Sequence, residues 1–527
     1  MDGPLAPLTE GEACSHCGYL AVAVASLPIL LPILLLLLHR PLLLLLGIYI
    51  RSFNGDKRDV LIRISEEEAI RNAKESSKPS LIVGFFHPYC NAGGGGERVL
   101  WAAVHANQQR HPHILNIVYT GDQVSKATIL ANVRLRFDID LDPSLVQFIH
   151  LQKRHLVSAA TWPRLTLLMQ SVGSLFLAAE AFTMLVPDVY IDTMGYAFTV
   201  LLAKRLFAIP TAAYVHYPTI STDMLGALSP SSGNLKKRYW QSFALLYSYA
   251  GKGIDVVVAN SSWTAGHLNA LWRGHFGLGV PQFDWLLNAA VKFISGSGSV
   301  KKGDVEVLFP PCAVGKLVHA IPLGEKCPPR EKVILYIAQF RPEKNHPLVL
   351  QAFHEFLSTA PEDLRNTRLV LVGSVREDQD EKKVYELRLL ARELQVEENV
   401  LFVTNAPWPE VIEWLGRASV GVNAMWNEHF GIGVVEYQAA GLICVVHDSG
   451  GPKLDIVVEV DGSRTGYHAT TAIEYADGFR KALSLDSAET AAMRERARKS
   501  AMRFSEEIFA DGWNRMMDAL LGSRKSQ

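Results

Sequence analysis

Short, almost continuous apolar runs recur along this chain between stretches of helical periodicity, and they form two series. The first comprises residues 81–86, 114–119, 146–150, 189–191, 211–215, 255–259 and 305–309. After Pro310-Pro311 and a polar stretch over 321–330, the second comprises residues 333–340, 368–373, 400–403, 420–423 and 443–447. Runs of this kind are typical of strands buried on both faces of a parallel sheet. The pattern therefore predicts two doubly wound α/β domains with a cleft between them.

Composition excludes several classes of protein for these 527 residues. Hydrophobic residues make up 49%, which is too many for a disordered chain, and a net charge of −1 argues against nucleic-acid binding. Six cysteines in so long a chain do not form a disulfide scaffold. Cys14-x-x-Cys17 has no second pair, so we interpret it as two ordinary thiols rather than a zinc site.

The N-terminal region carries an apolar segment long enough to cross a membrane. Residues 19–38 contain no charge, and a second apolar run covers residues 41–50. A signal peptide would begin with basic residues, whereas residues 1–18 contain acidic side chains and no Lys or Arg. We therefore expect a retained anchor over residues 19–50. Basic residues follow the segment and none precedes it, which predicts a lumenal tail over 1–18 and cytosolic domains after a linker over 51–79.

Three further segments interrupt the strand–helix pattern. Residues 165–186 are apolar with Glu180 as the single charge, which fits equally a buried core helix and a helix dipping into the membrane surface. The basic-aromatic cluster 236–240 fits lipid headgroups, although a solvated charged face is slightly favoured. Residues 274–303 are rich in Gly and Ser and predict a long surface insertion.

Four consecutive glycines, residues 93–96, follow the first predicted strand and open a helix. Glycines allow a ligand to approach the backbone closely, and a helix N-terminus favours an anion. The run lacks the third glycine of a dinucleotide fingerprint, and no phosphate-loop motif of NTPases occurs in the chain. His216 directly follows the predicted strand over 211–215, at the edge of the sheet where ligands bind. A structural role and a ligand-binding role fit this position equally.

Two loops in the second domain carry charged residues that suit a nucleotide sugar. Arg341 and Lys344 follow its first strand, and two cations there suit a diphosphate. Glu428 and Glu436 lie eight positions apart around a Gly-bearing helix start. Glu428 is expected in the loop and Glu436 about two turns into the helix, with the amides of residues 430–432 as free donors.

This pattern resembles the glycosyltransferases of family 4, which have the GT-B fold and the motif E-x7-E. The resemblance covers residues 80–520 and is closest to the eukaryotic α-1,2-mannosyltransferases that act on dolichol-linked oligosaccharides. The segments that carry it are GGGGERVLW (93–101), GYAF (195–198), YVHYPTIS (214–221), NSSWT (260–264), QFRPEKNHP (339–347) and residues 428–441. Such enzymes add the fourth and fifth mannoses from GDP-mannose at the cytosolic face of the endoplasmic reticulum.

The resemblance implies roles for individual residues. Glu428 would contact the transferred mannose, and Glu436 would bind the ribose. The remaining donor-binding residues implied by the family are Lys344, Phe430, Gly431, Ile432, Gly94 and Gly95. His216 would lie near the reacting carbon. The family usually has an Arg where this chain has Gln339, so Arg341 is the candidate for that contact.

The resemblance also implies a domain plan and a set of partners. Residues 80–316 would form the Rossmann-like acceptor domain, 317–505 the Rossmann-like nucleotide-sugar domain, and 506–527 a C-terminal helix. Expected partners are GDP-mannose, a dolichol-diphosphate-linked oligosaccharide, the endoplasmic reticulum membrane and other mannosyltransferases of the pathway. No cofactor is implied, and the lack of an Asp-x-Asp near the cleft motifs predicts metal independence. Two alternatives stay open: a GT-B enzyme with another nucleotide sugar or lipid-linked acceptor, or a non-catalytic binding module.

Overall fold

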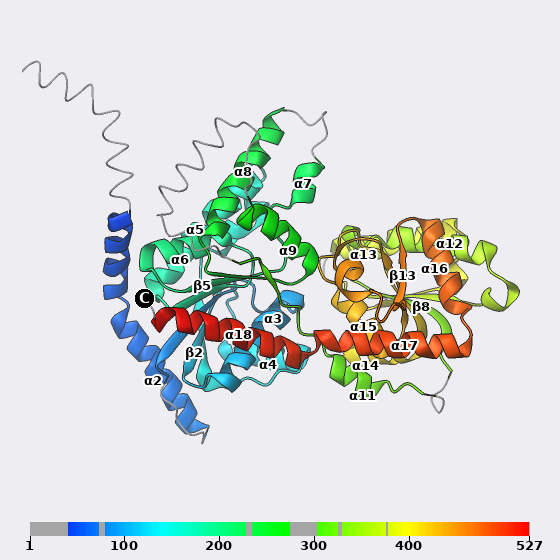
Figure 1. Ribbon diagram of the computed structural model, residues 1–527, viewed down its shortest axis with the longest axis horizontal. Helices are drawn as coiled ribbons and strands as arrows, with labels where there is room; N and C mark the ends of the chain where they lie inside the picture. Colours follow the sequence, from blue (N-terminus) through cyan, green and yellow to red (C-terminus); the bar gives the residue numbers. More distant parts are fainter. Residues whose placement is uncertain are drawn as a thin grey trace, which may run out of the picture.

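The computed structural model describes residues 40–72, 79–227, 234–274, 303–324, 329–375 and 378–525. The predicted tail, residues 19–39 of the predicted anchor, Cys14, Cys17 and nearly all of the Gly/Ser-rich stretch lie outside the described residues. Two α/β lobes lie side by side along the long axis of the molecule (Figure 1). We call residues 80–316 the N-terminal lobe and residues 317–505 the C-terminal lobe.

The N-terminal lobe contains a seven-stranded parallel sheet in the order β3-β2-β1-β4-β5-β6-β7. Its strands are β1 (Leu81–Phe86), β2 (Ile114–Thr120), β3 (Val146–His150), β4 (Val189–Asp192), β5 (Thr211–Val215), β6 (Val256–Ala259) and β7 (Glu306–Val307). Every strand falls on a predicted run, although β7 is shorter than expected. Side chains of β1 alternate between two cores, one holding Ile82 and Phe86 and the other Val83 and Phe85. Burial on both faces explains why the run is apolar throughout.

The C-terminal lobe contains a six-stranded parallel sheet in the order β10-β9-β8-β11-β12-β13. Its strands are β8 (Glu331–Ile337), β9 (Arg368–Gly373), β10 (Val400–Thr404), β11 (Ala418–Asn423), β12 (Ile443–His447) and β13 (Gly466–Ala469). β13 was not predicted from the sequence. It is an edge strand of four residues, Gly-Tyr-His-Ala, and so lacks the apolar continuity of a central strand.

Helices cover both faces of each sheet, as the doubly wound prediction requires. Helix α2 (Gly55–Arg71) precedes the first lobe in sequence and packs against it. The helices of the first lobe itself are α3 (Gly95–Arg110), α4 (Lys126–Phe137), α5 (Thr166–Met184), α6 (Ala197–Phe207), α7 (Thr222–Gly226), α8 (Asn234–Lys252) and α9 (Ser262–Leu268). In the second they are α11 (Val314–Ala320), α12 (His346–Thr359), α13 (Asp378–Glu393), α14 (Trp408–Arg417), α15 (Ile432–Ala440), α16 (Ala472–Leu483) and α17 (Ser487–Ala501).

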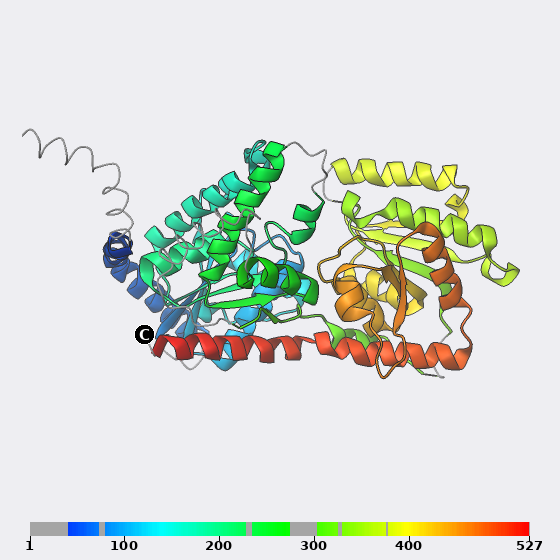
Figure 2. The same cartoon turned by 45° about the horizontal axis from the view of Figure 1, so that its top comes forward.

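The last helix, α18 (Glu506–Lys525), crosses back to the N-terminal lobe. Figure 2 shows α17 and α18 running in line beneath both lobes. Trp513 of α18 is fully buried, stacks against Phe85 of β1 and donates to Asn107 at 2.9 Å. Where the chain returns, the amide of Cys312 donates to the carbonyl of Phe504 at 2.9 Å. The two chain segments that connect the lobes are therefore hydrogen-bonded to each other.

The apolar stretch 165–186 forms helix α5, and the structure gives it two different faces. Leu177 and Phe182 belong to the core of the N-terminal lobe, whereas Phe176 is 57% exposed. Among the described residues, α5 is the one helix long and apolar enough to cross a membrane, and 39% of its apolar window is buried in the protein. One face of α5 is thus a core face, and the other is apolar and unpacked.

Candidate active site

Glu428 and Lys344, both predicted from the sequence, form an ion pair at the carboxyl ends of the C-terminal strands. Lys344 ends a short 3₁₀ turn after β8, and Glu428 lies in the loop after β11, the neighbouring strand. Their Nζ and Oε2 atoms are 2.5 Å apart, and both side chains are mostly buried. Asn423 donates to the same carboxylate oxygen at 3.4 Å. The ligand edge of an open α/β sheet therefore holds one cation and one carboxylate in contact.

The helix start after Glu428 has the expected anion-binding geometry. Gly431 is the N-cap of α15 with a φ of +109°, a backbone conformation that favours glycine. The first amides of α15 have no acceptor within the helix. The Phe430 ring is buried against Phe309 and Phe504, which leaves its backbone to contact a ligand. Because α15 begins at Ile432, Glu436 lies about one turn into the helix. The prediction that Glu436 lies two turns into the helix is therefore wrong.

Glu436 is partly exposed and lies in an apolar setting. Burial raises the pKa of its carboxyl from 4.5 to about 7, although the positive charge of Arg98 acts in the opposite direction. Arg98 belongs to α3 of the N-terminal lobe, where it donates to the Pro311 carbonyl at 2.9 Å and to Glu506 at 2.7 Å. The carboxyl thus titrates near neutrality, under the influence of a cation from the other lobe.

This raised pKa predicts opposite effects of Glu436→Gln on stability and on binding. The folded carboxyl retains its proton up to about pH 7, so the free energy of unfolding falls as pH rises from about 4.5 to about 7. Glu436→Gln removes this loss, so Tm of the ligand-free protein at pH 8 should exceed that of wild type. KM for the donor at pH 8 should rise about tenfold, as expected when a charge-assisted hydrogen bond is lost. Thermal unfolding and initial rates at pH 5.5 and pH 8 test both effects.

A matched variant controls for the loss of a carboxylate as such. Glu410→Gln removes a partly exposed carboxylate from α14 and should change neither quantity. An equal Tm for wild type and Glu436→Gln at pH 8 would contradict the raised pKa.

The glycine run places the start of α3 directly against the start of α15. A Cβ on Gly95 would lie 2.9 Å from the Cδ1 of Ile432, so a larger residue would require that side chain to shift. The amide of Gly94 donates to Glu97 at 2.5 Å, and Glu97 in turn faces the buried His87 at 3.4 Å. The two helix N-termini therefore meet across the cleft at Gly95 and Ile432, whereas Gly94 and Gly96 face side chains of their own lobe.

His216 follows β5 and points its ring towards the glycine run. A Cβ on Gly96 would lie 3.5 Å from its Nε2, which is buried and has no hydrogen-bond partner within the described part of the chain. Burial lowers the pKa of His216 to about 4, so its ring is neutral at physiological pH. An unpaired buried nitrogen beside the cleft is available to bond a substrate, which favours the ligand-binding alternative over the structural one.

Arg341, which is predicted to bind the donor, begins the same turn as Lys344 but does not lie beside Glu428. Its side chain is exposed and, among the residues that the structure describes, makes no hydrogen bond or ion pair. Lys344 instead lies against Glu428, because the turn over Pro342–Lys344 directs it back over the end of the sheet. Arg341 stays on the outside of that turn.

A second loop, which was not predicted from the sequence, holds Glu428 in place. After β12, the hydroxyl of Ser449 accepts from the amide of Asn427 at 2.8 Å, and the amide of Gly451 donates to the Glu428 carbonyl at 2.8 Å. A Cβ on Gly450 would lie 2.3 Å from that same carbonyl. The signal was present as Ser-Gly-Gly-Pro directly after a predicted strand.

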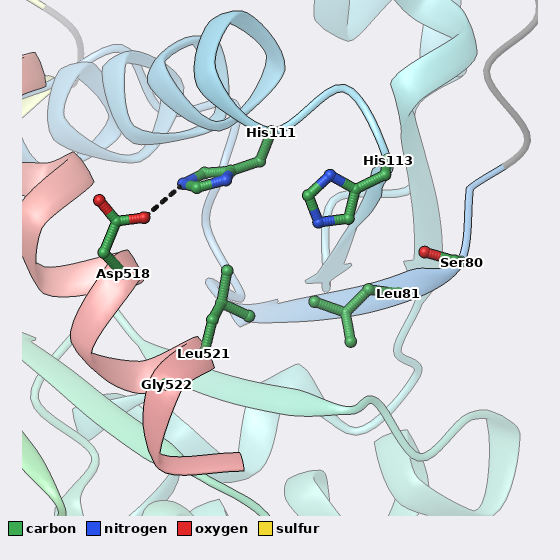
Figure 3. A pocket seen from close by; sticks show the side chains of 7 residues that line it. All are labelled: Ser80, Leu81, His111, His113, Asp518, Leu521 and Gly522. Atoms are coloured by element: carbon green, nitrogen blue, oxygen red, sulfur yellow. Dashed lines mark ion pairs between the residues drawn. The ribbon is translucent and has the colours of Figure 1, made fainter. Parts of the chain in front are cut away.

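Elsewhere, the described residues provide no metal site, and a cavity lies apart from these loops. They contain no group of three or more His, Cys, Asp and Glu side chains that could hold a metal ion. The cavity, of about 570 Å³, lies at the amino end of β1 beside the end of α18 (Figure 3). His111 and Asp518 line it, 3.5 Å apart. It is at the edge of the sheet opposite to the one that carries His216.

The two parallel-sheet lobes and the charged cluster between them define a glycosyltransferase of the GT-B fold. Residues 80–272 match the family described as ALG11 mannosyltransferase N-terminus, and residues 324–500 match Glycosyl transferases group 1. The chain belongs to the family of GDP-Man:Man(3)GlcNAc(2)-PP-Dol alpha-1,2-mannosyltransferases. It is 56% identical to the protein of that name from Neurospora crassa, over 82% of this chain and 78% of that one. Identity with the human protein is 40%, over 85% and 89% of the two chains.

Solved structures support the same fold at low sequence identity. The alpha,alpha-trehalose 6-phosphate synthase of Burkholderia multivorans superposes with a TM-score of 0.60 at 12% identity, over 84% of this chain and 99% of that chain. A glycosyltransferase from Rickettsia africae gives a TM-score of 0.56 at 15% identity, over 84% and 98%. These likenesses confirm the predicted pair of Rossmann-like domains.

Proposed function

We propose that this chain transfers mannose from GDP-mannose, in α-1,2 linkage, to a dolichol-diphosphate-linked oligosaccharide. The observation that carries the proposal is the Glu428–Lys344 ion pair just before α15, a helix whose first residue meets Gly95 of the other lobe. It lies in a chain whose relatives carry the name of this activity. The C-terminal lobe would hold the nucleotide sugar and the N-terminal lobe the acceptor.

Departure of GDP builds negative charge on a diphosphate, and the site offers fixed positive partners for it. Lys344 and the first amides of α15 would bind the phosphates, and stabilisation of charge that develops in the transition state is usually the largest catalytic contribution. Arrival of the donor would draw Lys344 from Glu428 towards phosphate. Glu428 would then stabilise the positive charge that develops on the mannose ring. The acceptor hydroxyl would attack from the face that the leaving group occupies, with retention of configuration.

The remaining predicted residues would assist this reaction from both sides of the cleft. The neutral His216 would donate to or accept from the mannose, because its free nitrogen faces the glycine run. Glu436 would accept from the ribose hydroxyls. Contact between Gly95 and Ile432 would exclude water from the cleft and so limit hydrolysis of the donor.

A transfer assay tests the function. Membranes that contain the protein are incubated with radiolabelled GDP-mannose, a dolichol-linked trimannosyl acceptor and EDTA. We expect labelled products that α-1,2-mannosidase cleaves, without a requirement for added metal. Transfer from UDP-sugars alone would favour another GT-B enzyme, and saturable binding without turnover would favour a binding module. Loss of transfer in EDTA that is restored by a divalent cation would contradict metal independence.

We also propose that the N-terminal lobe lies on the endoplasmic reticulum membrane with both lobes in the cytosol. The helix over residues 40–52 packs Gly47 against the Leu206 carbonyl at the end of α6, while Leu45, Ile48 and Tyr49 are 61–66% exposed. The basic-aromatic start of α8 adds Lys236 over the Trp240 ring.

Removal of the first 50 residues should therefore leave part of the protein bound to membranes. Phe176 on α5 and Leu246 on α8 are exposed apolar side chains that can bind to the membrane surface. Adding Phe176→Glu and Leu246→Glu to the truncated chain should release most of it in a flotation assay with liposomes. Ile473→Glu on the C-terminal lobe, at 71% exposure, is the matched control and should release none. Complete solubility of the truncated chain alone would contradict the proposal.

A further inference from the structure

Both residues that flank Glu428 are held by the opposite lobe. On one side, the Asn427 side chain donates to Asp223 of α7 at 2.9 Å. Asp223 also lies 3.5 Å from the Nε2 of His267 on α9. A carboxylate of the N-terminal lobe thus bonds the residue directly before Glu428.

On the other side, the ring of His429 stacks on aromatic rings of the N-terminal lobe. Its centroid is 4.2 Å from that of Tyr217, with 22° between the planes, and 5.3 Å from that of Trp263, with 18°. Tyr217 directly follows His216, and Trp263 belongs to α9. The residue directly after Glu428 is therefore fixed by a flat aromatic contact across the cleft.

The backbone between these contacts is in a conformation that needs support. Asn427 has a φ of +50°, in the left-handed region that non-glycine residues seldom occupy. Such residues persist where the surroundings hold them, and they cluster at functional sites. Nearby, the Ser262 amide at the start of α9 donates to the buried Asp455 of the C-terminal lobe at 2.9 Å, so α9 contacts that lobe through both residues 262 and 263.

We propose that Tyr217, Asp223 and Trp263 are positioning residues, which place the Glu428 carboxylate for transfer only when the two lobes are in contact. We call these three residues, with Asn427 and His429, the interlobe clamp. The inference rests on the proposed role of Glu428. The clamp does not include Lys344 or the start of α15, so donor binding to the C-terminal lobe does not depend on it.

The consequence is a split between binding and turnover. Without the clamp, GDP and GDP-mannose still find Lys344 and the α15 amides, but the Glu428 loop loses its supports on the acceptor side. Misplacement of a catalytic group by about 1 Å can cost about 10²-fold in rate. Clamp variants should therefore lower kcat while KM for GDP-mannose and the affinity for GDP stay near their wild-type values.

Paired substitutions test the clamp. We expect Asp223→Ala and His429→Ala each to lower kcat by about 10- to 100-fold, with KM for GDP-mannose changed by less than about twofold. Asp223→Asn keeps an acceptor for Asn427, and His429→Phe keeps a ring that can stack, so both should recover most of the rate. His319→Ala, an exposed histidine on α11, is the matched control and should keep full activity.

Two outcomes would overturn the inference. Full kcat in His429→Ala would show that the stack does not position Glu428, and an inactive His429→Phe would assign the imidazole a chemical role instead. Amide hydrogen exchange gives a readout that needs no turnover: residues 426–431 should exchange faster in His429→Ala and not in His429→Phe. If the wild type itself transfers no mannose, the proposed function fails, while the exchange comparison still decides whether the clamp holds the loop.

Discussion

Glu428→Gln is expected to reduce mannose transfer by about 10²- to 10³-fold while GDP binding is retained. The amide keeps the size of the side chain but cannot stabilise positive charge on the mannose ring, and loss of one such electrostatic contact commonly has an effect of this size. GDP affinity should stay equal or increase, because the substitution releases Lys344 from the ion pair it forms in the ligand-free protein. Transfer rates and calorimetric titration with GDP measure the two quantities separately.

A neighbouring carboxylate provides the matched control for this experiment. Glu343 is exposed on the turn that carries Lys344, and Glu343→Gln should leave both transfer and GDP binding unchanged. Full turnover in Glu428→Gln would contradict the site assignment. A large loss of GDP affinity would place Glu428 at the nucleotide rather than at the sugar.

Lys344→Ala is expected to weaken donor binding and turnover together. Hydrogen bonds to charged groups contribute about 1.5–3 kcal/mol, so GDP affinity should fall by about 10- to 100-fold. Transfer should fall further, because the same cation would stabilise the leaving diphosphate. Titration with GDP and single-turnover transfer measure the two losses.

One lysine variant and one arginine variant complete this test. Lys332→Ala removes an exposed lysine of β8 that pairs with Asp363, and it should alter neither quantity. Unchanged GDP affinity in Lys344→Ala would assign the phosphates to another cation. Arg341→Ala would then be the deciding variant, because Arg341 is the exposed cation of the same turn.

The parts of this molecule that the sequence predicts are those fixed by local pattern. Both sheets follow from continuous apolar runs, because central parallel strands must be apolar on both faces. Glu428 and Lys344 follow from position, since loops after neighbouring parallel strands meet at one edge of a sheet. Gly431 was correctly predicted at the start of the helix. Glu436 lies one turn into the helix and not two, because Gly431 itself is the N-cap.

The parts that could not be predicted depend on how the two lobes face each other. No spacing in the sequence connects Asp223 with Asn427, which are separated by 204 positions. The same holds for Gly95 and Ile432, which meet across the two lobes. The donor-binding role of Arg341 stays a prediction: its side chain is exposed on the turn that the left-handed Asn345 ends.

The return of α18 has a consequence for synthesis of the protein. Trp513 and Met517 complete a core whose other members, such as Phe85 and Val118, precede them by about 400 residues. The hydrophobic core of the first lobe therefore remains incomplete until the ribosome has made almost the entire chain. During synthesis the N-terminal lobe exposes the apolar face that α18 later covers. Premature stop codons near the end of the gene should therefore destabilise the lobe that is translated first.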